Sequence, residues 1–196
     1  MLKREFLPID IQYRGMISMV RYVAFLRGIN VGGNAIAKME ELKSVFSSLG
    51  LQNVKTILNS GNVIFETSDE NIHELAIKIM KGLREKFRFE IDVIVRTWSQ
   101  IVSMVNLNPF KDIAITPYTR FFVTFLPEEP KVGNKVPPSF NNCNYQVLQI
   151  KDGSVFSKIE LSQNSGTVEL MKILENEFGK KITTRNWNTI TKITKA

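Results

Sequence analysis

The sequence predicts an α+β protein made of two ferredoxin-like subdomains that are related by an internal duplication. The first observation is that apolar patterns of strand and helix length alternate in the order βαββαβ through the first half. The second is that this order returns in the second half. The offset between Trp98 and Trp187 is close to the offset between the tight turns at Ser60 and Asp152, which indicates a repeated unit.

The first half begins with a strand over residues 22–26, an apolar run rich in aromatic and β-branched side chains. Apolar residues then recur at helical spacing over 39–49, and Gly50 is placed to end this helix. Two further strands are predicted over 54–58 and 63–65, where apolar runs flank a tight turn.

A second helix is predicted over 72–83, where apolar residues return at helical spacing. Thr67 and Glu70 have the spacing of a capping box that would begin this helix. Alternating apolar residues over 91–95 predict the strand that completes the first subdomain. A connecting helix that opens at Trp98 follows.

The second half repeats this order in a less regular form. An irregular proline-rich stretch over 127–142 replaces the helix that would follow its first strand. Asp152-Gly153 is a strong hairpin signal between two later strands. The expected elements are a strand over 121–125, a hairpin over 145–150 and 155–159, a helix over 168–178 ended by Gly179, and a short strand around Ile182.

We therefore divide the chain into four parts. Residues 1–18 are expected to be an N-terminal extension outside the fold, with Met19 as the native start, because neither a helical stripe nor a signal peptide runs through them. The first subdomain covers 19–96, and a connecting helix and loop cover 97–118. The second subdomain, with a C-terminal helix, covers 119–196.

Composition indicates a basic, globular protein. The 196 residues carry a net charge of +7, and 43% of them are hydrophobic. The positive charge favours acidic partners such as nucleic acid or phosphorylated metabolites, or else serves solubility alone. The single cysteine, Cys143, excludes an internal disulfide and fits a cytoplasmic location. No apolar run is long enough to cross a bilayer, so we expect no membrane partner.

Three polar clusters stand where strands give way to turns or helices, and we predict that they bind a ligand. A scaffold presents backbone N–H groups and amides from such positions. In a ferredoxin-like unit, the loop after the first strand and the turn after the second strand reach the same edge of the sheet. The predicted binding residues are Arg27, Gly28, Asn30, Gly32, Gly33, Asn34, Asn59, Ser60, Gly61, Asn62, Arg185, Asn188, Thr189 and Lys192.

The chemistry of these residues favours an anionic, phosphorylated ligand. Glycines permit positive φ and close backbone approach, and successive N–H groups in such loops form an anion-binding nest. Arg27 supplies a fork that matches phosphate or carboxylate. Arg185, Asn188, Thr189 and Lys192 follow helical spacing and are expected on one face of the last helix. The same residue types also suit ordinary turns and a solvated helix face.

Three motifs carry a resemblance to a known family, and they are Tyr22-Val23-Ala24-Phe25-Leu26-Arg27-Gly28-Ile29-Asn30-Val31-Gly32-Gly33, Asn59-Ser60-Gly61-Asn62-Val63 and Arg185-Asn186-Trp187-Asn188-Thr189. They resemble the bacterial domain-of-unknown-function family numbered sixteen ninety-seven, from about Met19 to the C-terminus. The resemblance implies a compact α+β protein with two ferredoxin-like subdomains. It brings no activity, substrate or catalytic residues.

Three functions stay open at this point. We favour binding of a nucleotide-like metabolite or nucleic acid through the Gly/Asn-rich loops. The first alternative is an enzyme acting on a small anionic substrate, for which no catalytic residue is identified. His73 is expected to face solvent, and Cys143 has no charged neighbour in sequence to activate it. The second alternative is a self-associating structural or regulatory module of open oligomeric state. No cofactor and no metal-ligand spacing is predicted.

Overall fold

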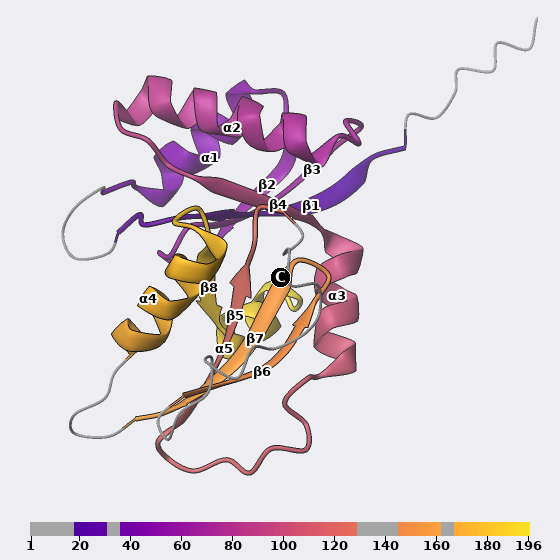
Figure 1. The fold of residues 1–196 in the computed structure, drawn as a ribbon. Coiled ribbons are helices and arrows are strands. Elements are labelled where there is room, and N and C mark those ends of the chain that lie inside the picture. The colour runs from indigo at the N-terminus through magenta and orange to yellow at the C-terminus, as the bar shows by residue number, and fades with distance from the viewer. Residues whose placement is uncertain (1–17, 31–35, 129–144, 162–166) are drawn as a thin grey trace, which may run out of the picture.

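The computed structural model describes residues 18–30, 36–128, 145–161 and 167–196. Within these residues the chain forms an α+β fold with two four-stranded antiparallel sheets and five helices. One face of each sheet contributes to a shared core, and helices cover the other faces (Figure 1). None of the described helices is both long and apolar enough to span a membrane.

The first sheet has the strand order β2-β3-β1-β4. Its central strand β1 is buried on both faces, which explains why it reads as a continuous apolar run rather than an alternating one. The elements of this half are β1 (Val20–Leu26), α1 (Met39–Ser48), β2 (Gln52–Ile57), β3 (Asn62–Thr67), α2 (Ile72–Phe87) and β4 (Val93–Thr97). They follow the predicted order along the chain.

The second sheet has the order β6-β7-β5-β8, which places its strands in the same relative arrangement as the first. Its elements are β5 (Thr119–Phe125), β6 (Tyr145–Lys151), β7 (Ser154–Glu160), α4 (Thr167–Phe178) and β8 (Thr183–Asn186). The hairpin signal is confirmed, since Asp152 and Gly153 both take positive φ between β6 and β7. Most of the proline-rich stretch lies outside the described residues.

Each sheet is followed by a helix that packs toward the centre. α3 (Trp98–Leu107) follows β4, and α5 (Trp187–Ile193) follows β8. Their apolar residues join the inner faces of both sheets in one core, in which the rings of Phe25 and Phe125 stack with centroids 4.1 Å apart. α1 and α2 cover the opposite face of the first sheet (Figure 1).

The predicted capping box at the start of α2 is wrong. Asn71 is the N-cap residue, and its side-chain oxygen accepts hydrogen bonds from the backbone N–H groups of His73 at 3.1 Å and Glu74 at 3.2 Å. Thr67 instead ends β3, where its hydroxyl accepts from the N–H of Asp69. The helix therefore starts later than the capping-box spacing implies.

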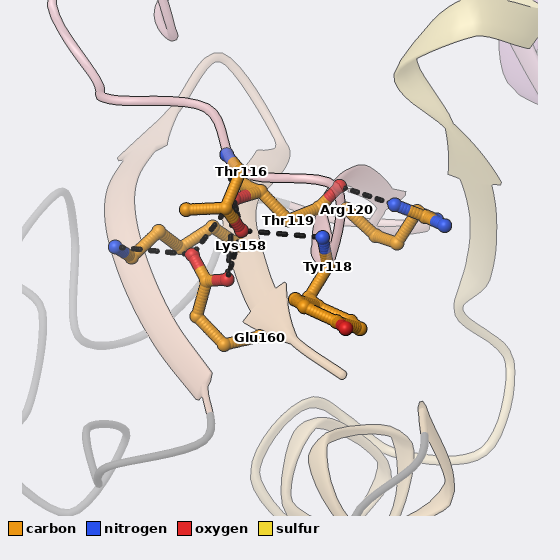
Figure 2. A network of polar contacts seen from close by, with 6 residues as sticks. All are labelled: Thr116, Tyr118, Thr119, Arg120, Lys158 and Glu160. Carbon is orange, nitrogen blue, oxygen red and sulfur yellow. Dashed lines mark hydrogen bonds and ion pairs between the residues drawn. The ribbon is translucent and has the colours of Figure 1, made fainter. Parts of the chain in front are cut away.

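A network of polar contacts fixes the connector between α3 and β5 (Figure 2). The buried hydroxyl of Thr119 lies 2.9 Å from Glu160 Oε1 on the neighbouring strand β7 and accepts a hydrogen bond from the N–H of Thr116. The Thr116 hydroxyl donates to the same carboxylate, and Lys158 lies 3.7 Å from it. The network therefore holds the end of the connector against the two central strands of the second sheet, β5 and β7.

Candidate functional site

Two of the predicted polar clusters meet at one edge of the first sheet. The side-chain amide of Asn30 donates to the carbonyl of Asn59 at 3.0 Å, and the N–H of Leu26 donates to the carbonyl of Gly61 at 2.8 Å. β1 and β2 both pair antiparallel with β3, so the loop after β1 and the turn after β2 arrive side by side. Gly32, Gly33 and Asn34 lie outside the described residues.

The asparagine amides at this edge are engaged within the protein. Asn30 also donates to the carbonyl of Ala37 and accepts from its N–H, both at 2.9 Å, so that its side chain closes the loop on itself. The buried amide of Asn62 donates to the carbonyl of Ile57 and contacts the hydroxyl of Ser60. These contacts hold the loop and the turn in shape. The side chains of Asn59 and Ser60 are exposed.

The glycines of the two clusters serve different needs. Gly28 and Gly61 both take positive φ, +69° and +70°. A Cβ placed on Gly61 would lie 2.8 Å from Ile29 Cδ1 and 2.9 Å from Leu26 Cβ, whereas a Cβ on Gly28 would meet no atom within 4 Å. Close packing and backbone geometry therefore both require glycine at position 61. At Gly28, which is exposed, only the backbone geometry favours glycine.

Arg185 reaches this edge from the second half of the chain. Its Nε donates to Asn62 Oδ1 at 2.6 Å, and its Nη2 donates to the carbonyls of Leu26 at 2.7 Å and Gly61 at 3.2 Å. The guanidinium carbon lies 5.7 Å from the centroid of the Phe25 ring. Burial lowers the pKa of Arg185 to about 10, so the side chain remains charged at neutral pH.

The prediction that Arg185 shares a helix face with Asn188, Thr189 and Lys192 is wrong. Arg185 lies in β8, and α5 begins two residues later, with Asn186 as its N-cap. The alternation of a strand, rather than helical spacing, sets its direction into the buried interface. The other three lie on α5, where Asn188 and Lys192 are exposed and Thr189 is half-buried.

Arg27 also crosses between the halves of the chain. Its Nη2 lies 2.7 Å from Glu175 Oε1 on α4, and about a third of each side chain is exposed. The guanidinium is thus already paired with a carboxylate. An incoming anion would compete with Glu175 for it.

Arg96 makes contacts equivalent to those of Arg185, but it reaches from the first sheet to the second. Its Nη2 donates to the carbonyls of Leu126 at 2.6 Å and Gly153 at 3.1 Å, which follow β5 and lie in the β6–β7 turn. Its guanidinium carbon lies 5.8 Å from the centroid of the Phe125 ring. Each arginine therefore leaves one sheet and binds the strand end and turn of the other.

A cleft of about 580 Å³ opens beside Arg96, and we call it the α3 cleft. One wall is a stripe along α3 made by Ser99, Gln100, Ser103, Met104 and Leu107. The facing wall is the β6–β7 hairpin, through Gln149, Lys151, Asp152, Ser154 and Phe156. Arg96 and Pro109 complete the lining. Its volume is within the range of small-molecule pockets.

The electrostatics of the α3 cleft favour negative charge. Arg96 and Lys151 face one carboxylate, that of Asp152, in the lining. Within the part of the chain that the structure describes, the Lys151 ammonium makes no hydrogen bond or ion pair. The hydroxyls of Ser99 and Ser103 and the amides of Gln100 and Gln149 add hydrogen-bonding capacity.

Sequence reasoning missed every residue of the α3 cleft as a candidate. Serine, glutamine and lysine are common on surfaces, and their meeting depends on a helix and a hairpin far apart in the chain. The one available signal is the likeness of Arg96-Thr97-Trp98 to Arg185-Asn186-Trp187. It marks Arg96 as a residue of the interface between the sheets, and Arg96 also lines the cleft.

The structure also limits how nucleic acid could be bound. Proteins of the RNA-recognition type stack bases on aromatic side chains of an open sheet face. Here Phe25 and Phe125 are fully buried against each other, and the opposite face of the first sheet is covered by α1 and α2. Among the described residues, no group of three or more acidic, histidine or cysteine side chains is placed to hold a metal ion.

These observations define an α+β protein with two joined antiparallel sheets and a polar cleft between a helix and a hairpin. The chain belongs to the DUF1697 family, described as proteins of unknown function, whose model matches residues 19–156. It is similar in structure to the conserved bacterial protein SP0830 from Streptococcus pneumoniae, with a TM-score of 0.67 and 23% sequence identity. That likeness covers 91% of this chain and 98% of the other. A search of curated proteins found no match.

Proposed function

We propose that this protein binds a small anionic molecule in the α3 cleft. The observation that carries the proposal is the Lys151 ammonium, which lines the cleft without a hydrogen-bonding or charged partner among the described residues. The Lys151 residue is half-buried, and an incoming phosphate or carboxylate would give its ammonium a charge-assisted hydrogen bond without displacing an internal partner. The net charge of +7 favours the approach of such a ligand.

The dimensions favour a metabolite over nucleic acid. A volume of about 580 Å³ suits a ligand of nucleotide size. The buried sheet faces argue against stacking of bases on the sheets. Nucleic acid bound through its phosphates alone remains the alternative ligand, and it would bind over a wider surface with a steep salt dependence.

The Gly/Asn loops are the second candidate position for the same ligand class. Gly28, Asn59 and Ser60 are exposed there, and Arg27 is partly exposed beside them. In favour of the α3 cleft, Arg27 is already paired with Glu175, and the Asn30 and Asn62 amides are engaged in internal hydrogen bonds.

We also propose that the two halves are ferredoxin-like subdomains related by internal duplication, in a cytoplasmic protein. Support for the duplication comes from the matching strand orders and from the reciprocal contacts of Arg96 and Arg185. In each half a first strand ends beside a tight turn, with the N–H of Leu26 on the carbonyl of Gly61 and that of Leu126 on the carbonyl of Gly153.

Calorimetric titration of the full chain tests the binding proposal. The probes are inorganic phosphate, a sugar phosphate, a nucleoside monophosphate and a single-stranded oligonucleotide. We expect Lys151→Met to weaken binding of the monophosphates about tenfold or more, the scale of one charge-assisted hydrogen bond. Lys43→Met is the matched control, since Lys43 is exposed and lies outside the α3 cleft.

Binding at the Gly/Asn loops would give the opposite pattern of variant effects. If Arg27→Met weakens binding and Lys151→Met does not, the ligand binds at the loops. An absence of binding by every phosphate probe at millimolar concentration contradicts a phosphorylated ligand at both positions.

A further inference from the structure

Polarity changes along the α3 cleft from one end to the other. The first turn of α3 and the tip of the β6–β7 hairpin meet at one end, where Arg96 donates to the carbonyl of Gly153. Ser99, Gln100, Lys151 and Asp152 line this end. All are polar or charged, so the end suits a hydrogen-bonding headgroup.

The other end of the cleft is apolar. Met104 and Leu107 lie one and two turns further along the same helix stripe, and Pro109 follows the helix. Across from them lies Phe156, which is two residues further down the hairpin strand than Ser154 and forms the buried floor. Leu107 is 60% exposed, a large apolar side chain with no cover in the described part of the chain.

The exposed side chain of Leu107 is not part of the core. The opposite face of α3 supplies the core through Ile101, which is fully buried. Met104 is half-buried, and its flexible thioether side chain can adapt to an apolar group beside it. An apolar group that extends from the headgroup end would cover Leu107 and contact Phe156.

We infer that the ligand of the α3 cleft is an organic acid with an apolar body, held by its carboxylate or phosphate beside Lys151 and by its apolar part between Leu107 and Phe156. The inference rests on the proposed function, because it names the class of ligand for the same cleft. A ten-residue helix is roughly 15 Å long. The cleft therefore accommodates an extended body of several methylenes or one aromatic ring.

Asp152 sets a further preference. Its position in the hairpin turn, at a φ of 48°, keeps a carboxylate at the headgroup end together with Lys151 and Arg96. One negative charge opposite two positive charges favours a monoanion over a dianion. Asp152→Asn preserves the turn, because asparagine also tolerates positive φ. Since the variant lacks the carboxylate, the difference in affinity between monoanions and dianions should become smaller.

The test is a calorimetric titration series of linear alkanoates from acetate to octanoate, with the matching alkyl phosphates, alcohols and amines. We expect the affinity of the acids to rise by up to about fourfold per methylene until the cleft is filled. Alcohols and amines of the same length should bind at least tenfold more weakly than the acids. The alkyl phosphates distinguish a phosphate from a carboxylate headgroup.

Two variants separate the ends of the cleft. Leu107→Gln should abolish the dependence on chain length while leaving the affinity of the shortest acids unchanged. Lys151→Met should weaken all acids by a similar factor and leave the chain-length dependence in place. Leu58→Gln, at another exposed leucine outside the cleft, is the control for each. Because Leu107 and Leu58 are exposed, thermal unfolding should confirm that both variants fold.

The outcomes separate this inference from the proposed function. If inorganic phosphate or sugar phosphates bind through Lys151 but alkyl chains add no affinity, the inference is overturned and the proposed function stands. Alcohols that bind as tightly as the acids also overturn it. If no anion binds at all, the proposed function falls, and this inference falls with it.

Discussion

Arg96 and Arg185 bind each other's sheets through the same kind of contact. Each donates from Nη2 to a carbonyl at the end of a central strand, Leu126 for Arg96 and Leu26 for Arg185, and to a turn glycine beside it. Each guanidinium also lies within 6 Å of the centroid of a phenylalanine ring in the sheet that it enters. These reciprocal contacts join the two halves of the molecule.

Removal of Arg185 should destabilise the protein strongly. Arg185→Met leaves the carbonyls of Leu26 and Gly61 and the amide oxygen of Asn62 without their donor in a buried interface. We expect a loss of about 3 kcal/mol in the free energy of unfolding, measured by urea denaturation. Arg120→Met is the control, because Arg120 also donates to two carbonyls but is exposed, and it should cost under about 0.5 kcal/mol. A similar loss for both variants would contradict the role assigned to Arg185.

Alanine substitutions at Gly61 and Gly28 should separate packing from backbone strain. Both glycines have nearly the same positive φ, so each substitution carries a strain of about 1 kcal/mol. Only Gly61→Ala also forces a Cβ against Ile29 and Leu26, which adds about 1–3 kcal/mol of overpacking. Thermal and urea unfolding of the two variants should therefore differ. Equal stabilities would show that the turn can move away from Ile29.

Phe25 and Phe125 should be energetically coupled. Truncation of either to leucine removes the stacked ring contact at the centre of the shared core. In a double-mutant cycle we expect a coupling of about 1 kcal/mol, measured from the unfolding free energies of the single and double variants. Phe46 and Phe125 lie in separate cores and should show no coupling.

Glu66 should contribute to stability in a pH-dependent way. Hydrogen bonds from Asn53 first, and from Arg21 next, hold the pKa of Glu66 below its usual value of 4.5. Because the pKa is lower in the folded state than in the unfolded state, its contribution is complete above pH 4.5 and is lost as the pH falls through the lowered pKa. Glu66→Gln should therefore flatten the acid end of a stability curve measured by urea denaturation from pH 2 to 7. A curve unchanged by this substitution would show that other carboxylates dominate.

The sequence allowed much of the fold to be predicted. The apolar periodicities placed the elements, and strand order explained why the loop at Asn30 reaches the turn at Asn59. Arg185 was wrongly expected on the last helix because its spacing to Asn188, Thr189 and Lys192 is helical, although it lies in β8. The asparagine side chain of Asn186 caps the helix, which therefore begins after Arg185.

The candidate site was harder to predict, for a physical reason. Glycine, asparagine and arginine serve equally in ligand loops and in buried turns, and only coordinates show that Asn62 and Arg185 bind each other. Lys151 gave no signal in the sequence, because its significance is the lack of a partner among the residues that the structure describes.

The shared core has a consequence for proteolysis. Each half has a core of its own, but α3 and α5 also join residues of both sheets in a third, shared cluster. Lys111 lies exposed in the connector between the halves, where trypsin has access. A chain nicked there should stay together as a single species on gel filtration, and the two fragments should separate only after denaturation.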